Sequence, residues 1–462
     1  MKLVTRSTGW GGASIALLVA SLVISQTLPA QPRLPVILDS LQPEMLKQDF
    51  RTFYEVIGQE HAGLYRYKSK MVLDKLFDSC LATLNHPMTQ LEFAKSIMFA
   101  ISAIEDGHTG TNIPRLLMNS YSEQVKMFPV HLFFIAKKAY VLCSRIKELS
   151  AGTQILSIDG RPVSTIRDTL FQYLPSDGKI ETKKQQTLNN GAFNFLYNWI
   201  YDNKDSFLVV HKTKEGEIKA TTIRAALIKD VECANDSRPG TRDLQLDFLP
   251  GKTALLTIKT FDENRLSGKQ DFRNFLNATF DEIHKTVKVE KLIIDLRGNA
   301  GGTDAFGALL YSHLTGQPFK YFSSIESTSR KVSAGENSLL GLQPPQKNAF
   351  KGEVFFLVDG LSFSTTADFC SIAKSNNRGK FIGEETGGGY YGNTSGETTR
   401  LELPNSKINI IIPKWKYINE VKKSGYKDRG VIPDHKVIAT IDDVISGRDV
   451  QLEFAIRLSR QK

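Results

Sequence analysis

The sequence has few of the residues that mark several protein classes. Its 462 residues include only four cysteines, Cys80, Cys143, Cys233 and Cys370, spaced too widely for a zinc-binding CxxC motif. Four cysteines are also too few for a disulfide scaffold in so long a chain, which favours buried free thiols with room for one bridge. Glycine (34) and proline (17) are near their average shares, so the chain is neither collagen-like nor of low complexity.

Dense charge clusters are also missing. Lysine and arginine (59) outnumber aspartate and glutamate (49), but the basic residues are scattered without interleaved aromatic side chains. The sequence therefore indicates no nucleic-acid partner. Charged residues (23%) and hydrophobic residues (41%) have the shares of an ordinary globular protein with enough apolar mass for a large core.

The first 30 residues have the pattern of a secretory signal peptide. Lys2 and Arg6 precede a largely apolar run over residues 13–24, and Ala30 offers a small residue for cleavage. The run is shorter than the roughly 20 residues that a membrane span needs. The sequence thus predicts an exported protein, periplasmic or secreted, whose net charge falls from +10 to +8 on cleavage. An uncleaved run would instead anchor the chain at a membrane.

Residues 31–118 are predicted to form an N-terminal helical region. Thr89 and Glu92 have the spacing of a capping box at a helix start. One apolar stripe then recurs at helical intervals and consists of Phe93, Ile97, Ile101 and Ile104. Because glycine often ends helices, we expect this one to end before Gly107, which places His108 just past a helix terminus.

Residues 119–235 have the pattern of a small β-domain. Residues 130–136 and 139–143 are predicted to pair as strands, and residues 151–163 (AGTQILSIDGRPV) to form a hairpin around an Asp-Gly turn. The hairpin resembles the GxxILxINGxxV segment of PDZ domains, which bind extended peptides by strand addition. The alternative is a β-domain without a peptide groove, since folds are often reused without their function.

Residues 236–462 alternate strands with helices. The predicted strands span residues 254–258, 291–296, 352–358 and 408–412. An amphipathic helix is marked by apolar residues from Phe272 to Ile283, and a second helix is expected over residues 364–374. This alternation implies an α/β core with largely parallel strands, whose functional sites lie at the carboxyl ends of the strands.

Two turns that follow buried strands could carry chemistry. In residues 292–302 (LIIDLRGNAGG), glycines after the strand let backbone N–H groups point at a ligand oxygen, although neither a P-loop nor a dinucleotide fingerprint is present. In residues 355–368 (FFLVDGLSFSTTAD), Ser362 and Ser364 stand where a helix begins. A hydroxyl there can act as a nucleophile in the field of the helix end, or it can simply cap the helix.

Four motifs in order resemble those of the C-terminal-processing (tail-specific) peptidase and tricorn-core family of serine peptidases. They are residues 292–302, 362–366 (SFSTT), 381–389 (FIGEETGGG) and 429–434 (RGVIPD). The PDZ-like stretch upstream also fits, so the resemblance covers most of the mature chain. It implies an α/β catalytic core of the C-terminal-processing peptidase type, preceded by the helical region and a PDZ-like β-domain.

The resemblance implies a role for several residues. The second serine of the Ser-x-Ser pattern, Ser364, corresponds to the nucleophile of the family. The amides of Thr365 and Gly301 correspond to the oxyanion hole. A serine without a base is a poor nucleophile, so a base must be found.

Many relatives use a lysine as that base, but Gly389 occupies the matching place here, and Lys374 and Lys380 do not match the motif. The tricorn-like branch instead uses a histidine from the N-terminal part of the catalytic unit, which His108 resembles. An imidazole titrates near neutral pH and can pass the serine proton to the leaving amine. The alternative is a loop histidine without a role.

The acid that would orient His108 stays open. In the tricorn pattern a serine precedes the histidine and a distant glutamate supports it, whereas Gly107 precedes it here. Asp428 lies near the place of the family's acid. Asp106 competes with it but could equally close the turn, and Glu384 competes but could belong to a structural ion pair.

Together these features predict an exported serine endopeptidase that cuts unfolded or C-terminally exposed segments of exported proteins. The expected partners are protein or peptide substrates, guided by the PDZ-like domain, and no metal or organic cofactor is implied. The departures from the family pattern keep two binding alternatives open. One is a lipid-binding protein similar to the retinoid-binding protein of the retina, and the other is a scaffold that holds peptides without cutting them.

Overall fold

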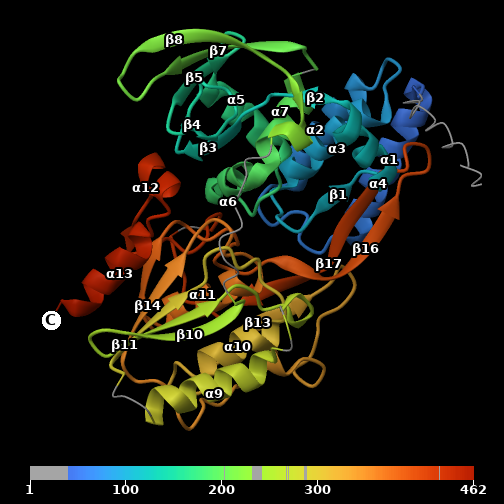
Figure 1. Ribbon diagram of the computed structural model, residues 1–462. Coiled ribbons are helices and arrows are strands. Elements are labelled where there is room, and N and C mark those ends of the chain that lie inside the picture. Colours follow the sequence, from blue (N-terminus) through green and yellow to red (C-terminus); the bar gives the residue numbers. More distant parts are fainter. Residues whose placement is uncertain are drawn as a thin grey trace, which may run out of the picture. The chain divides into compact units, whose positions relative to one another are not determined.

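A computed structural model describes residues 40–201, 203–231, 242–266, 268, 270–285, 289–425 and 427–461, without the side chains of residues 116, 117 and 120. The expected signal peptide, residues 1–30, and Cys233 lie outside the described residues. All described residues belong to one folded unit (Figure 1). Within them, no helix combines the length and the apolar character that crossing a membrane requires.

Three helices follow one another at the start of the described chain: α1 (Pro43–Glu60), α2 (Lys70–Thr83) and α3 (Gln90–Ile104). The predicted capping box is confirmed, because the Glu92 N–H donates to Thr89 Oγ1 at 3.2 Å and the Thr89 N–H donates to the Glu92 carboxylate at 2.8 Å. The predicted stripe of α3 is fully buried. The helix ends before Gly107 as expected, but Glu105, with φ of 63°, takes the left-handed cap position.

Replacing Thr89 with Ala is expected to destabilise the protein by about 1 kcal/mol, because the N–H of Glu92 loses its acceptor at the start of α3. The shift of the urea denaturation midpoint measures this loss. Ser79→Ala is the control, since Ser79 only donates to the Lys75 carbonyl within an exposed turn of α2. An equal shift in both variants would contradict the role of the cap.

A short connection leads to the β-domain and consists of β1 (Gly110–Asn112), α4 (Arg115–Gln124) and β2 (Lys126–Met127). The strands of the β-domain lie in the order β3-β4-β5-β7-β8, with β6 paired to β5. These strands are β3 (His131–Ile135), β4 (Lys138–Cys143), β5 (Gln154–Ile158), β6 (Arg161–Pro162), β7 (Ser206–Lys212) and β8 (Ile218–Arg224). The expected tight turn is present, with positive φ at Asp159 (49°) and Gly160 (76°).

Helical segments interrupt the β-domain, which the sequence pattern did not predict. They are α5 (Val163–Leu170), the 3-10 turn η1 (Phe171–Tyr173), α6 (Glu181–Thr187), the π-helical turn η2 (Leu188–Ala192) and α7 (Phe193–Tyr201). The short β9 (Ala226–Leu227), which pairs with β2, and α8 (Ile228–Val231) follow β8. One apolar cluster joins α5 and α7 to β3, β4, β5 and β7.

The α/β core contains a six-stranded sheet in the order β10-β11-β12-β14-β15-β18. Its strands are β10 (Leu244–Leu249), β11 (Thr253–Ile258), β12 (Lys291–Asp295), β14 (Glu353–Val358), β15 (Lys380–Gly383) and β18 (His435–Lys436). Only β10 pairs antiparallel, which confirms the expected largely parallel sheet.

Helices cover both faces of this sheet. They are α9 (Phe272–Lys285), α10 (Asp304–Ser312), α11 (Thr365–Ser375) and α13 (Val450–Arg460). The helix α12 (Ile441–Ser446) instead contacts β4, and the 3-10 turns are η3 (Glu263–Arg265) and η4 (Ser338–Leu340). Alternate residues of β12 and β14 join different clusters: Ile293 and Phe355 pack with α13, whereas Ile294 and Phe356 pack with α9, α10 and α11. Strands buried on both faces explain the continuous apolar runs in the sequence.

A second sheet was not predicted. It is antiparallel, runs in the order β1-β17-β13 with β16 paired to β17, and contains β13 (Phe322–Glu326), β16 (Thr394–Glu402) and β17 (Asn409–Asn419). Ile410 and Ile412 of β17 pack against α1 to α3 in one cluster. The expected strand over 408–412 is therefore the start of a longer strand that links the N-terminal helices to the core.

The cysteines agree with the expectation of mostly buried thiols. Cys80 and Cys370 are free and buried, and Cys143 is disulfide-bonded.

Candidate active site

Two turns at the carboxyl ends of β12 and β14 are joined by hydrogen bonds. The Gly298 N–H donates to the Asp359 carboxylate at 3.1 Å. Ser362 Oγ donates to the Leu296 carbonyl at 2.9 Å, and Ser362 is fully buried. The glycine turn and the serine turn that the sequence singled out therefore form one framework, at the edge of the sheet where α/β proteins bind their ligands.

Ser364 stands at the first turn of α11 in a strained backbone conformation. Its φ of 55° and ψ of −131° lie where residues with a side chain are rarely found. It occupies the N-cap position, yet its side chain makes no capping hydrogen bond. The capping alternative thus fails for Ser364. Strain of this kind is concentrated at functional sites.

Gly301 packs directly against Ser364. A Cβ on Gly301 would lie 2.7 Å from Ser364 Cβ and 3.0 Å from the Thr365 nitrogen, and φ of Gly301 is 98°, so only glycine fits. Thr365 is the first residue of α11, where N–H groups and the helix dipole favour negative charge. The Gly301 N–H, however, donates to Asn299 Oδ1 at 2.9 Å. The structure brings both expected oxyanion residues to Ser364, and Asn299 holds one of the two amides.

His108 lies in the loop between α3 and β1. Asp106 shapes this loop, because its Oδ1 accepts the N–H groups of His108 and Thr109 at 3.0 and 2.9 Å. The His108 ring stacks on the ring of Phe363, with centroids 4.4 Å apart. No described residue forms a hydrogen bond with either ring nitrogen of His108. The structure therefore brings His108 beside the residue that precedes Ser364, without a hydrogen bond between the two.

Burial governs the charge state of His108. It lowers the pKa of the imidazole from 6.5 to about 4. The charge of Asp106 opposes this lowering, while Lys183, Arg66 and His61 reinforce it. An imidazole with that pKa is neutral at neutral pH and keeps the lone pair that a general base needs.

Asp428 forms no hydrogen bond with the His108 ring. Its carboxylate instead forms an ion pair with Lys179 at 2.7 Å, and its carbonyl accepts the Lys179 N–H at 2.8 Å. The hydrogen bond from Lys179 holds the pKa of the Asp428 carboxyl below its usual value. Closeness to the motif 429–434 in sequence therefore does not bring this carboxylate to the imidazole.

The other two candidate acids are also occupied. Oδ1 of Asp106 closes the turn around His108, which is the structural role that the sequence analysis kept open for it. Glu384 accepts a hydrogen bond from Gln186 Nε2 at 2.6 Å, and burial raises its pKa. Of the three acids, Asp106 is the one whose charge acts on His108.

The third and fourth motifs meet beside the serine turn. Arg429 Nε and the Gly430 N–H both donate to Glu385 Oε1, at 2.7 and 2.9 Å. A Cβ on Gly388 would lie 3.3 Å from the Ser364 nitrogen, so this turn packs against the start of α11. All four motifs that carried the family resemblance thus converge around Ser364.

The place at which many relatives have a lysine has no room for one. A Cβ on Gly389 would lie 2.6 Å from Tyr67 Oη, and the Gly389 N–H donates to Asp177 Oδ2 at 3.0 Å. Lys374 points elsewhere, in an ion pair with Asp434 at 2.5 Å. The base of a peptidase reaction must come from another part of the chain.

Sequence reasoning missed two charged residues next to His108, the buried Asp177 and the partly buried Lys183. Asp177 Oδ1 accepts the Gly107 N–H at 2.7 Å, and Lys183 Nζ donates to the Gly107 carbonyl at 2.9 Å. Both belong to the segment around α6, within the region expected to be a β-domain. Neither lies in a motif, so only their spatial contact with the His108 loop reveals them.

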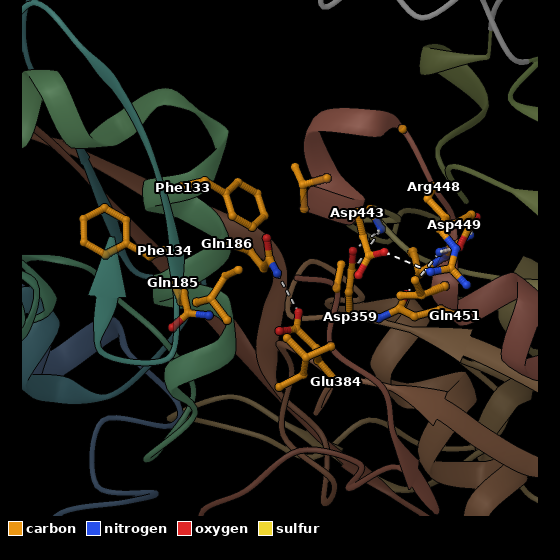
Figure 2. A pocket seen from close by; sticks show the side chains of 18 of the residues that line it. Phe133, Phe134, Gln185, Gln186, Asp359, Glu384, Asp443, Arg448, Asp449 and Gln451 are labelled. Atoms are coloured by element: carbon orange, nitrogen blue, oxygen red, sulfur yellow. Dashed lines mark hydrogen bonds and ion pairs between the residues drawn. The ribbon is translucent and has the colours of Figure 1, made fainter. Parts of the chain in front are cut away.

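A cavity of about 370 Å³ adjoins the framework of the two turns. It is lined by Gly298 and Asp359, by residues of β3 and α6, and by α12, α13 and the residues next to them. Figure 2 shows Gln186 directed at Glu384, while Phe133 of β3 lies on the side of the cavity away from α13. Its lining is mixed polar and apolar, and neither Ser364 nor His108 belongs to it.

Comparison with known proteins assigns the core of the chain to a family. Residues 252–437 match the model of peptidase family S41, and this match contains all four motifs and Ser364 but not His108. A search of the curated proteins found no match. Mature CPAF is similar in structure (13% identity, TM-score 0.63, covering 90% of this chain and 97% of that one). The structure of mature CPAF complexed with lactacystin is similar as well (13% identity, TM-score 0.62, covering 90% of this chain and 98% of that one).

At such low identity these structural likenesses show the fold alone, whereas the family model rests on the sequence of the core itself. The resemblance drawn from the four motifs is thereby confirmed for the core: residues 252–437 of this chain match peptidase family S41, a family of serine peptidases.

Proposed function

We propose that Ser364 is the nucleophile of this peptidase and His108 its general base, with the amides of Gly301 and Thr365 as the oxyanion hole. The observation that carries the proposal is the Ser364 hydroxyl, which makes no helix-capping hydrogen bond. Ser364 is held in a strained backbone conformation at the start of α11 and packs against Gly301. A free hydroxyl at a helix N-terminus next to a glycine turn is the arrangement that acyl transfer requires.

In this proposal Ser364 Oγ attacks the carbonyl carbon of the scissile peptide bond, and His108 takes the hydroxyl proton. The tetrahedral oxyanion is stabilised by the two amides, and His108 returns the proton to the leaving amine. Water then attacks the acyl-enzyme with His108 again as base. Because catalytic hydrogen bonds often form only with bound substrate, the ring of His108 engages Ser364, and the Gly301 amide leaves Asn299, when a peptide binds.

We further propose that the substrates are unfolded or C-terminally exposed segments of exported proteins. Two observations support this assignment. The cavity beside the turns has a mixed polar and apolar lining, to which β3 and α6 of the β-domain contribute. The pattern of residues 1–30 is typical of a secretory signal.

Exposure to a fluorophosphonate, followed by intact-mass analysis and peptide mapping, tests the nucleophile. We expect one adduct on Ser364, absent in Ser364→Ala and lost or much slower in His108→Ala, because the reagent needs an activated serine beside an oxyanion hole. Ser371→Ala is the matched control, since Ser371 lies on the same helix and only donates to the Ala367 carbonyl at 2.8 Å.

An adduct that persists in Ser364→Ala would assign the nucleophile to another residue. Folded wild-type protein that gives neither an adduct nor peptide cleavage would favour the binding alternatives. The occupied Gly301 amide and the unpaired His108 ring are the observations that support those alternatives. Extraction of an apolar molecule from the purified protein would then identify the lipid-binding one.

A further inference from the structure

Lys183 is a partly buried lysine at the candidate active site that no motif accounts for. Burial lowers the pKa of its ammonium group from 10.5, and the charges of Asp177 and Asp106 oppose this lowering. Its Nζ donates to the carbonyl of Gly107 at 2.9 Å and lies 3.5 Å from the carbonyl of Pro175. It also lies 3.9 Å above the centroid of the Phe363 ring. Among the described residues, no carboxylate forms an ion pair with this ammonium group. Carbonyl dipoles, an aromatic face and the nearby charges of Asp177 and Asp106 therefore favour its ammonium form.

The same segment fixes both polar groups of Gly107. Asp177 accepts the Gly107 N–H at 2.7 Å through Oδ1 and the Gly389 N–H at 3.0 Å through Oδ2, while Lys183 binds the Gly107 carbonyl. Gly107 directly precedes His108. The loop that carries the imidazole is thus tied to α6 and, through Asp177, to the turn beside Ser364.

Lys183 and His108 contact one aromatic ring. The imidazole stacks on Phe363 with centroids 4.4 Å apart, and the ammonium lies over the same ring. An imidazolium formed there would be a second positive charge in a buried site, which like-charge repulsion disfavours. From the other elements, Asp106 of the loop opposes this effect on His108, whereas Arg66 and His61 from the region after α1 add to it.

We propose that Lys183 is a positioning residue of this peptidase: it holds the His108 loop through the Gly107 carbonyl and disfavours a positive charge on the neighbouring imidazole, so that His108 stays in the neutral form that accepts the Ser364 proton. The role in catalysis rests on the proposed function of His108 as base. The electrostatic effect on the imidazole does not, and it can be measured without turnover.

Carbon-13 NMR of histidine-labelled, full-length protein tests the electrostatic part. His108 is assigned among the eight histidines by its loss in His108→Gln. In Lys183→Met we expect the proton affinity of His108 to rise at least about tenfold, because the opposing charge is gone. Lys183→Gln removes the charge but keeps a donor for the Gly107 carbonyl, so it should give a similar rise with a better-held loop.

Lys184→Met is the matched control. Lys184 is the next residue of α6, is also largely buried and donates to the Phe171 carbonyl at 2.9 Å, but it is not among the charges that act on His108. An unchanged His108 titration in both Lys183 variants, or an equal rise in Lys184→Met, would overturn the proposal.

Kinetics separate this proposal from the proposed function. The acidic limb of kcat/KM reports the free base, so it should move to higher pH in Lys183→Gln, whereas a purely structural loss would lower kcat at every pH. Asp177, whose pKa burial raises to about 6, titrates in the same range, which is why the NMR signal of His108 is decisive. The His108 titration could shift in protein that neither reacts with the fluorophosphonate nor cleaves peptides. That result would support the electrostatic role of Lys183 and reject the proposed function.

Discussion

Replacing Ser364 with Ala is expected to lower kcat/KM for an unfolded protein substrate by about 10⁴–10⁶-fold. The carbonyl of the scissile bond would then face no hydroxyl at the start of α11, and the remaining rate would come only from substrate binding and the oxyanion donors. His108→Ala is expected to cost about as much, since an unassisted serine hydroxyl is a poor nucleophile.

The double variant gives the sharpest version of this prediction. Because a nucleophile and its base act as one unit, Ser364→Ala combined with His108→Ala should be no slower than either single variant. Hydrolysis of a fluorogenic unfolded protein measures all three rates. Multiplicative losses in the double variant would show that the two residues act independently and would remove His108 from the base position.

Two controls replace residues of the same types elsewhere in the protein. Ser371→Ala removes a buried hydroxyl of α11 that bonds only within its helix. His313→Gln removes another buried histidine, which stacks on Phe280 with centroids 4.4 Å apart. Both variants should keep at least about half of the wild-type rate, because neither side chain belongs to the framework of the two turns.

The sequence was most informative where local chemistry decides the structure. The capping box of α3, the Asp-Gly turn after β5 and the apolar runs of β12 and β14 each depend on residues close in sequence, and all three are confirmed. The turns around Gly301 and Ser364 were also recognisable from their local sequence. A glycine stands at 301 because the backbone there passes very close to Ser364.

Long-range contacts explain what the sequence did not predict. Asp177 from the loop before α6 and Lys183 from α6 reach Gly107 across about 70 residues of sequence, and nothing in their local pattern marks them as part of a site. Asp428 stands next to a family motif, yet its carboxylate forms an ion pair with Lys179, which is distant in sequence. Partners of this kind are chosen by tertiary packing, which no spacing rule describes.

The absence of a lysine at Gly389 also acquires a physical reason. Tyr67 from the N-terminal region and Asp177 from the β-domain fill the space that such a side chain would need. These same two regions supply His108 and the residues that hold its loop. Side chains from the N-terminal region and the β-domain therefore occupy the space in which many relatives have the lysine of a core motif.

Arg297→Met is expected to destabilise the protein by about 3–5 kcal/mol. Arg297 forms bidentate hydrogen bonds with Asp295, at 2.9 Å each, and with Asp449, at 2.7 Å each. Asp295 is buried, and removing the guanidinium would leave its carboxylate with Lys259 at 3.2 Å and the N–H of residue 297 at 3.0 Å. Because the turn after β12 starts at this pair, labelling of Ser364 should fall as well.

The pH dependence distinguishes this ion pair from a simple loss of packing. Burial opposes ionisation of Asp295, but the hydrogen bonds and charge of Arg297 outweigh it and hold the Asp295 pKa below 3.8. The pair therefore stabilises the fold above the unfolded-state pKa of about 3.9, and this contribution disappears as pH falls through the folded-state pKa. In Arg297→Met the buried carboxyl has a raised pKa, so protonation favours the folded state instead.

The difference in free energy of unfolding between wild type and Arg297→Met should consequently be largest near pH 7 and shrink towards pH 4. Urea denaturation at several pH values measures it. Asp295→Asn in the Arg297→Met background should recover part of the stability, because no buried charge remains. Arg448→Met, which removes an exposed arginine paired with Glu453 at 2.7 Å, should cost less than about 1 kcal/mol. A loss in Arg297→Met that stays constant from pH 7 to pH 4 would show that Arg297 acts through its packing and not through the charge of Asp295.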